Sequence, residues 1–341
     1  MNEPSEASNL PAAITGGFAG IPAALIPASI RALDRLIGAA VDIPVAWLEY
    51  QKVKITSQID AFRTVDAAII KNAASKAGND DEYADRALNN VVRKSYRQLK
   101  NKEAVSAAML EDMRDRAADN PDVKADAGAV NEPAPIDDDW LNVFERYAED
   151  ASTERMQKLW GRVLSGEVRA PGKYSMRTLR FLSEFSQADA LGFSALCQNT
   201  FGDLAPKNLV KPEGMTDIRD LLYMESAGLI QGASGMGLSS KQMFAESGRL
   251  FMREGNLAIM LNGIPNTQFE YEVIALTPLG QELVTLLPGR DARAAARSVA
   301  MAIRGPHVTS AFLMLIGDDG SAMTMEVLWQ DSTQAAPVES T

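Results

Sequence analysis

The 341-residue sequence contains one cysteine, Cys197, and one histidine, His307. One cysteine cannot build a disulfide framework or a cysteine-based zinc site within the chain. A catalytic thiol needs an activating base, and a lone histidine without a serine motif is equally poor support for a catalytic triad. Cys197 follows the apolar residues Ala195 and Leu196, so we expect it to be a small buried side chain.

Motifs that bind phosphates or activate a nucleophile are missing as well. The sequence has no Walker-type loop, no dinucleotide-binding glycine pattern and no nucleophile elbow. The glycine-rich stretch 232–237 lacks the Lys-Ser/Thr of a phosphate cradle, and we interpret it as a flexible loop. The acidic runs 137–139 and 318–319 are interpreted as a helix cap and a turn. The sequence therefore predicts no catalytic, metal or cofactor site and a protein that is not an enzyme.

Positive charge is in short supply: 34 Lys and Arg residues stand against 45 Asp and Glu residues, which gives a net charge of -11. Nucleic-acid binding depends on a concentrated basic face, so this average disfavours nucleic acid as a partner, although it is compatible with a local basic stripe. The N-terminus carries Glu3 and Glu6 and lacks the basic region of a secretory signal. These features predict a cytoplasmic protein.

Residues 10–48 form an apolar arm that is rich in Ala, Gly and Ile and is interrupted by proline. Its second part has amphipathic spacing, and the candidate interaction residues on that helical face are Ile30, Leu33, Leu36 and Ile37. Three arrangements fit the pattern: a helical hairpin packed on the protein, an arm docked on a membrane surface, or a membrane span. Proline and glycine disfavour the span. Docking would place the protein at the periphery of the inner membrane.

Long helices are predicted next. One over 45–76 and another over 81–118 predict a helical hairpin that occupies residues 49–118. Residues 119–136 are rich in small residues, Asp and Pro, and we interpret them as a linker between domains. The chain is predicted to close with a disordered tail over 331–341.

Residues 137–290 are predicted to form one domain, a central helical block followed by a winged-helix-like α+β unit. The block carries three large aromatic residues at helical spacing, which are Trp140, Tyr147 and Trp160. We interpret them as the core of a helix pair, and any ring that is exposed becomes a candidate contact with a partner.

The winged-helix-like interpretation rests on the order of the predicted elements. A helix over 217–227 precedes extended runs near 249–253, 257–261 and 270–276, and a final helix opens at Thr277–Pro278. Winged helices often bind DNA, but the first of these helices is acidic, which suits a protein contact better than a phosphate backbone.

Residues 291–330 add an Ala- and Arg-rich helix and a β-hairpin formed by 308–316 and 322–329. The predicted fold class is therefore mainly α. It has an N-terminal helical arm or hairpin, a central helical block, a winged-helix-like α+β unit and a C-terminal β-hairpin.

A family resemblance is carried by Asp138-Asp139-Trp140-Leu141 and by Leu159-Trp160-Gly161-Arg162-Val163-Leu164-Ser165-Gly166-Glu167. On these runs, residues 137–287 resemble a bacterial family known only as a domain of unknown function. The resemblance implies no known activity. Similar elements occur in some proteins linked to abortive infection, which implies a role in anti-phage defence by analogy alone.

The favoured hypothesis is a non-enzymatic interaction protein that binds a protein partner or a second copy of itself, with the apolar arm meeting a membrane or a partner. Long helices with modest apolar stripes favour self-association. The alternative is a winged-helix regulator that binds nucleic acid, and a third hypothesis is a hydrolase with an unrecognised carboxylate site. No cofactor is expected.

Overall fold

The computed structural model describes residues 18–37, 81–119, 135–210, 218–235, 237–287, 289–317 and 320–331. Its contacts divide the chain into two compact units, residues 1–179 and 180–341. The helix predicted over 45–76, most of the linker, the Asp318–Asp319 turn and nearly all of the C-terminal tail lie outside the described residues.

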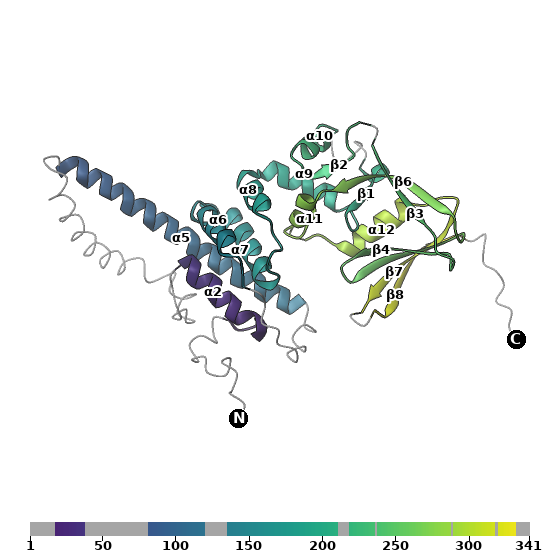
Figure 1. Ribbon diagram of the computed structural model, residues 1–341, viewed down its shortest axis with the longest axis horizontal. Helices are drawn as coiled ribbons and strands as arrows, with labels where there is room; N and C mark the ends of the chain where they lie inside the picture. The colour runs from purple at the N-terminus through teal and green to yellow at the C-terminus, as the bar shows by residue number, and fades with distance from the viewer. Residues whose placement is uncertain are drawn as a thin grey trace, which may run out of the picture. The chain divides into compact units, whose positions relative to one another are not determined.

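The first unit is helical (Figure 1). Its described elements are η2 (Ala23–Leu25), α2 (Ile26–Ile37), α5 (Asp81–Asp119), α6 (Asp138–Glu149) and α7 (Glu154–Arg169), and α8 (Met176–Glu184) contains the division between the units. α5 runs for 39 residues. It contains neither proline nor glycine, which explains why the predicted second long helix is not interrupted.

The C-terminal half of α5 forms the centre of this unit. Val105, Met109 and Met113 recur every four residues and are buried against α6 and α7. α6 and α7 begin where the sequence provides caps: Asp137 accepts from the Trp140 amide at 2.8 Å, and Thr153 accepts from the Met156 amide at 3.3 Å. The acidic run before Trp140 is therefore a helix cap, as predicted.

α2 packs within the first unit. It contacts α5, α6 and α7, and its apolar face is buried at Leu33 and Leu36, while Ile30 and Ile37 are half-buried. Of the three arrangements considered for the apolar arm, packing against the protein describes this part of it. Among the helices that the structure describes, none is both long and apolar enough to cross a membrane.

The second unit combines helices with two sheets. Its helical elements are α9 (Gln187–Cys197), η4 (Lys207–Leu209), α10 (Ile218–Ser226), α11 (Pro278–Val284) and α12 (Ala292–Ala302). Its strands are β1 (Leu204–Pro206), β2 (Ile230–Gln231), β3 (Leu238–Met243), β4 (Arg249–Glu254), β5 (Leu257–Gly263), β6 (Gln268–Leu276), β7 (Val308–Ile316) and β8 (Ala322–Gln330).

β6 is the centre of the first sheet. Three shorter strands pair antiparallel with it, namely β1, β2 and β3. A capping box at Ser186 begins α9, and Thr277 caps α11 with proline at the first turn. Cys197 is buried at the end of α9, as expected.

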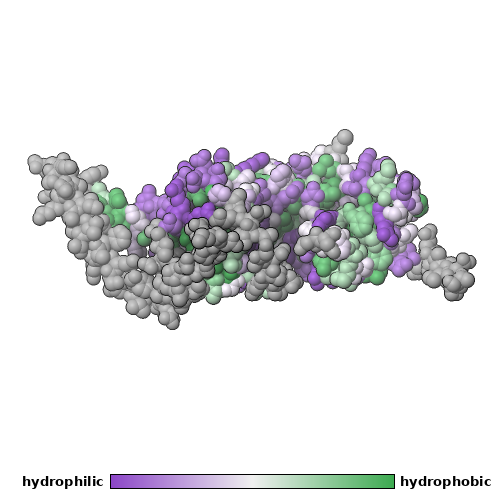
Figure 2. Space-filling view, turned by 60° about the horizontal axis from the view of Figure 1, so that its bottom comes forward, coloured by the Kyte–Doolittle hydropathy of each residue, from purple (hydrophilic) through white to green (hydrophobic). Residues whose placement is uncertain are grey.

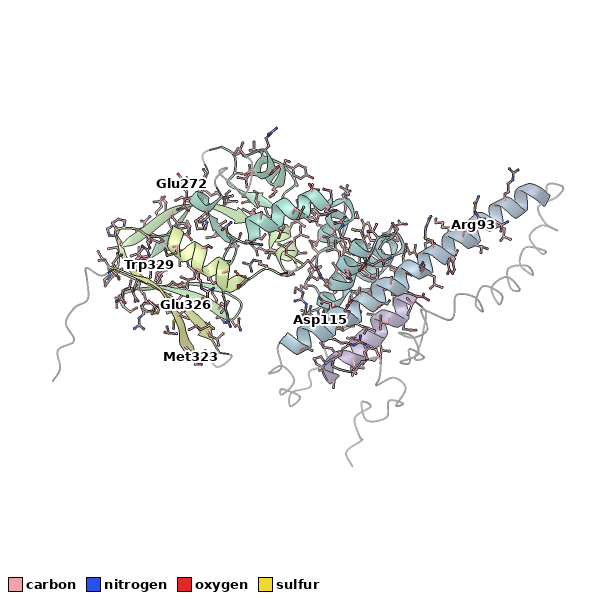
Figure 3. The ribbon with its side chains drawn as sticks, turned by 180° about the vertical axis from the view of Figure 1, so that it is seen from behind. Arg93, Asp115, Glu272, Met323, Glu326 and Trp329 are labelled. Carbon is pink, nitrogen blue, oxygen red and sulfur yellow. The ribbon has the colours of Figure 1, made fainter. Side chains whose placement is uncertain are left out.

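The second sheet has the order β4-β5-β7-β8, with every pair antiparallel. α12 covers one of its faces, where Ile259, Leu261 and Leu313 meet Val299 and Trp329 in one core cluster. Trp329 also donates its indole N–H to the Ala300 carbonyl at 2.8 Å. Figure 3 shows Trp329 and Glu326 on β8.

This second sheet shows that the predicted mainly α fold is wrong, because two four-stranded antiparallel sheets make the C-terminal part β-rich. The predicted winged-helix-like unit is wrong in the same way. Its runs at 249–253 and 257–261 pair with each other, and the second of them pairs with the C-terminal hairpin and not with the strand at 270–276. The physical reason is that β5 needs a long apolar neighbour, and β7 provides one over seven paired positions.

Candidate functional site

The aromatic residues of the family-like segment form a buried stack. Trp140 stacks on Phe144 with ring centroids 5.1 Å apart, and Tyr147 stacks on Trp160 at 5.3 Å. Trp140 and Trp160 are buried, and Tyr147 is half-buried. The core interpretation therefore describes both tryptophans, whose rings cannot reach a partner while the helices stay packed.

The glycines and the acid of the same segment hold the helices together. A Cβ at Gly161 would lie 2.6 Å from the Ala108 Cβ, so the residue lets α7 approach α5 closely. A Cβ at Gly166 would lie 2.6 Å from the Tyr174 ring. Glu167 is buried and accepts from the backbone amides of Gly172 and Tyr174, the latter at 3.0 Å. These contacts indicate an architectural signature rather than an active site.

A polar network between α5 and α7 also uses this segment. The Asp112 carboxylate accepts from the Ser165 hydroxyl at 2.7 Å and from Arg116 at 2.9 Å, and Arg169 lies 3.6 Å away. Burial lowers the pKa of Arg169. The Asp112 carboxylate faces two guanidinium groups and a hydroxyl, and these contacts link α5 to α7. The network offers no acid–base pair to a substrate.

The backbone of the glycine-rich loop after β2 donates hydrogen bonds to a carboxylate side chain of the protein, that of Glu225. The Glu225 carboxylate accepts from the backbone amides of Gly232 at 2.8 Å, Ala233 at 3.1 Å and Ser234 at 2.9 Å. Hydrogen bonds from the Ser234 side chain and then from these amides lower the pKa of Glu225. Glu225 is one of the acidic residues of the helix predicted over 217–227, and it is the internal partner of this loop.

Because the folded pKa of Glu225 is lowered, its stabilising contribution is present above the ordinary value of 4.5 and is lost as the pH falls through the folded pKa. We expect a carboxylate chemical-shift titration by NMR to give a midpoint below 4.5 for this residue. Glu225→Ala should also speed amide exchange at Gly232 and Ala233, whereas Asp220→Ala on the same helix should not. Unchanged exchange in Glu225→Ala would refute the role of the carboxylate.

A pocket of about 450 Å³ lies beside α10 and β6. Its lining is mostly apolar and includes Ile218, Leu221 and Ile274. The charged residues in the lining, Lys207 and Glu272, form an ion pair at 3.6 Å. Such a lining favours apolar groups, and in the described part of the chain no cluster of three or more His, Cys, Asp or Glu residues could hold a metal ion.

The face of the second sheet that points away from α12, which we call the outer face, carries an apolar row across all four strands. The register pairs Phe251 with Met260, Met260 with Phe312, and Phe312 with Val327. Phe251 is 51% exposed and Val327 is 55% exposed, at the two ends of the row. Figure 2 shows areas of hydrophobic surface on the second unit, at the right of the view.

The two central strands are apolar on both faces. β5 reads Leu-Ala-Ile-Met-Leu and β7 contains Ala-Phe-Leu-Met-Leu-Ile, without the alternation of apolar and polar residues that a solvated face produces. One face of these strands meets α12, and among the described elements their other principal contacts are with each other and with β4 and β8. The outer face is therefore patterned for burial and is the best candidate for a functional surface.

Two further rows border the apolar row on the outer face. One row has the polar ends Arg253 and Thr324 around the apolar residues Ala258 and Met314, and the other begins at Arg249 and is polar on all of the remaining strands. The sequence contained a signal for this surface, the two-sided apolar runs of β5 and β7. Sequence reasoning missed it because the pairing of β5 with β7 was not foreseen.

Comparison with known proteins places the chain near an uncharacterised group. The model of a family described as "Protein of unknown function (DUF2806)" matches residues 92–254, which supports the resemblance to a domain-of-unknown-function family. The match includes most of α5 and ends at β4. No curated protein and no solved structure matches the chain.

Proposed function

We propose that the protein acts as a non-enzymatic assembly protein and that two copies associate through their outer faces. The observation that carries this proposal is the uncharged row Phe251, Met260, Phe312 and Val327 on a sheet face that is patterned for burial. Neighbouring strands lie about 4.8 Å apart, so the row is roughly 14 Å wide. Face-to-face packing of two such sheets is a common way to bury this kind of surface.

A second copy fits the outer face because each row of side chains across the four strands is complementary to the same row read in the opposite strand order. A two-fold axis parallel to the strands would place Phe251 opposite Val327 of the second copy and Met260 opposite its Phe312. It would also place Ala258 opposite Met314 of the second copy. Phe251 then meets the smaller Val327, and Met314 meets the smaller Ala258, while Met260 and Phe312 meet at the centre, and each contact occurs twice, as a two-fold interface requires.

Charge supports the same arrangement. Arg249 and Arg253 lie on β4, at one edge of the face, and the reversed sheet would place Gln330 and Thr324 opposite them. The arginines of the two copies therefore stay apart, and neither is buried against a like charge.

The interface predicts that Phe251→Asp converts the dimer into a monomer. Each dimer carries the change twice, and losing the burial of one phenylalanine costs about 2 kcal/mol, so the dissociation constant should rise about 10³-fold. Light scattering coupled to size-exclusion chromatography of the full chain measures the molar mass, which should fall from twice 36.8 kDa to 36.8 kDa.

Met323→Asp is the matched control. Met323 lies on β8, is 62% exposed, and pairs with Leu315 on the face opposite the apolar row, at the end of the hairpin (Figure 3). It should leave the dimer intact. A wild-type chain that is monomeric, or two variants that behave alike, would overturn the proposal.

The other expected roles have less support. α2 buries Leu33 and Leu36 and leaves Ile30 and Ile37, the other two candidates for membrane docking, half-buried, and the anti-phage role rests on analogy alone. The assembly proposal depends on neither.

A further inference from the structure

The N-terminal half of α5 concentrates positive charge within an acidic protein. Residues 86–102 contain six Lys and Arg residues and no Asp or Glu, although the whole chain has a net charge of -11. Nearly every residue from Arg86 to Arg97 is exposed, in contrast to the C-terminal half of the helix. Figure 3 shows Arg93 standing out from this part of α5.

Four of these residues lie on one face of the helix. Arg86, Arg93, Arg97 and Lys100 are spaced by seven, four and three residues, and at about 100° per residue all four fall within about 40° of one line. We call this set the basic stripe. It extends for about 21 Å along the helix axis, at a rise of 1.5 Å per residue. Each of the four residues is exposed.

The C-terminal end of this helix segment contacts α6 within the unit. Lys102 donates to Glu145 of α6 at 2.8 Å, and the neighbouring Gln98 donates to Glu149 at 2.8 Å. The half-buried apolar residues of the segment, Leu88, Val92 and Leu99, lie on the side of the helix opposite the stripe. The segment thus separates a packing side from a basic side.

We infer that the basic stripe binds the phosphate backbone of double-stranded DNA. Three of its four members are arginines, whose planar guanidinium groups match phosphate oxygens in a bidentate way. A helix that is exposed on most sides fits the major groove of B-form DNA, which is about 12 Å wide, whereas the deep groove of duplex RNA is too narrow. The contacts are to the backbone, so binding has little sequence preference.

An anionic membrane is the less suitable occupant. A helix that lies in a membrane surface needs a broad apolar face with large side chains next to its basic residues. Here the exposed large apolar residues are Val91 and Tyr96 alone within the segment, and the other apolar side chains are half-buried.

Fluorescence anisotropy of the full chain with a labelled 20-base-pair duplex of arbitrary sequence tests the proposal. Four phosphate contacts predict a slope of about -3.6 for log affinity against log salt, and therefore about a 100-fold loss of affinity between 50 and 200 mM salt. Arg93→Gln combined with Arg97→Gln should halve the slope, to about -1.8. Glutamine preserves helix propensity, and circular dichroism confirms that the helix is retained.

A double variant at two exposed arginines elsewhere, Arg155→Gln with Arg180→Gln, is the control of equal charge. It should keep the wild-type slope. Equal losses in both double variants would show a general charge effect and overturn the inference, as would an absence of binding at 50 mM salt. Binding to vesicles of anionic lipid, without binding to the duplex, would overturn it in favour of a membrane.

Discussion

Gly161→Val is expected to destabilise the helical unit by about 3 kcal/mol or more. A Cβ at this position would lie 2.6 Å from the Ala108 Cβ and 2.7 Å from the Met109 backbone nitrogen, so α7 would have to move away from α5. A backbone atom cannot rotate aside as a side chain can, and the aromatic stack on α6 and α7 would separate with the helices. Urea unfolding monitored by far-ultraviolet circular dichroism measures the loss.

Lys158→Val separates this steric effect from helix propensity. Lys158 lies on α7, one turn before Gly161, and is half-exposed in an ion pair with Glu154. Introducing a β-branched residue there should cost less than about 1 kcal/mol. If Gly161→Val costs no more than Lys158→Val, the close approach of α5 and α7 does not depend on the glycine.

Arg290→Met is expected to destabilise the second unit by about 3–5 kcal/mol. The guanidinium group of Arg290 donates to both carboxylate oxygens of Glu254, to the Cys197 carbonyl at 3.0 Å and to the Thr200 carbonyl at 2.6 Å. The side chains of Arg290 and Glu254 are 12% and 22% exposed. Removing the arginine would leave a largely buried carboxylate without its counter-charge and with only the Gly202 amide as a donor, and it would also remove a donor from each of the two carbonyl groups.

Arg297→Met provides a comparison within the same unit. Arg297 also binds a carboxylate with two nitrogens, that of Glu326, but the two side chains are 48% and 39% exposed. Surface ion pairs contribute about 1 kcal/mol or less, so this variant should unfold close to the wild type. Similar losses in Arg290→Met and Arg297→Met would contradict the burial argument.

Local signals in the sequence predicted helix ends well. Asp137, Ser186 and Thr277 each cap a helix in the structure as their side-chain chemistry predicts. The buried state of Cys197 followed from its apolar neighbours for the same reason. These features depend on residues within a few positions of one another.

Pairing over long distances could not be read in the same way. β5 pairs with β7 across about fifty residues, and the intervening β6 belongs to the other sheet. Grouping the runs at 249–253, 257–261 and 270–276 in one winged-helix-like unit therefore gave β5 the wrong second neighbour. The absence of alternation in β5 and β7 was the available signal, because a strand with one solvated face would alternate.

The net charge and the overall composition of the chain do not reveal the two candidate surfaces, which are the basic stripe and the outer face. A net charge of -11 disfavours nucleic acid for the whole chain, yet the basic stripe on α5 contains no acidic residue. Trp140 and Trp160, two candidate interaction residues from the sequence, lie in the core. The apolar row of the outer face begins instead at the exposed Phe251, in a strand of mixed composition. Surfaces of this kind depend on register, which composition does not reveal.

Cross-linking tests the two-fold outer-face interface most directly. A Phe251→Cys chain is mixed with a Val327→Cys chain and treated with a short bismaleimide, because packed sheets lie about 10 Å apart, beyond the reach of a disulfide. The native thiol does not compete, since burial raises the pKa of Cys197 to about 12. The interface predicts covalent dimers in the mixture and few when either variant is treated alone. Equal cross-linking of each variant with itself, or none in the mixture, would contradict it.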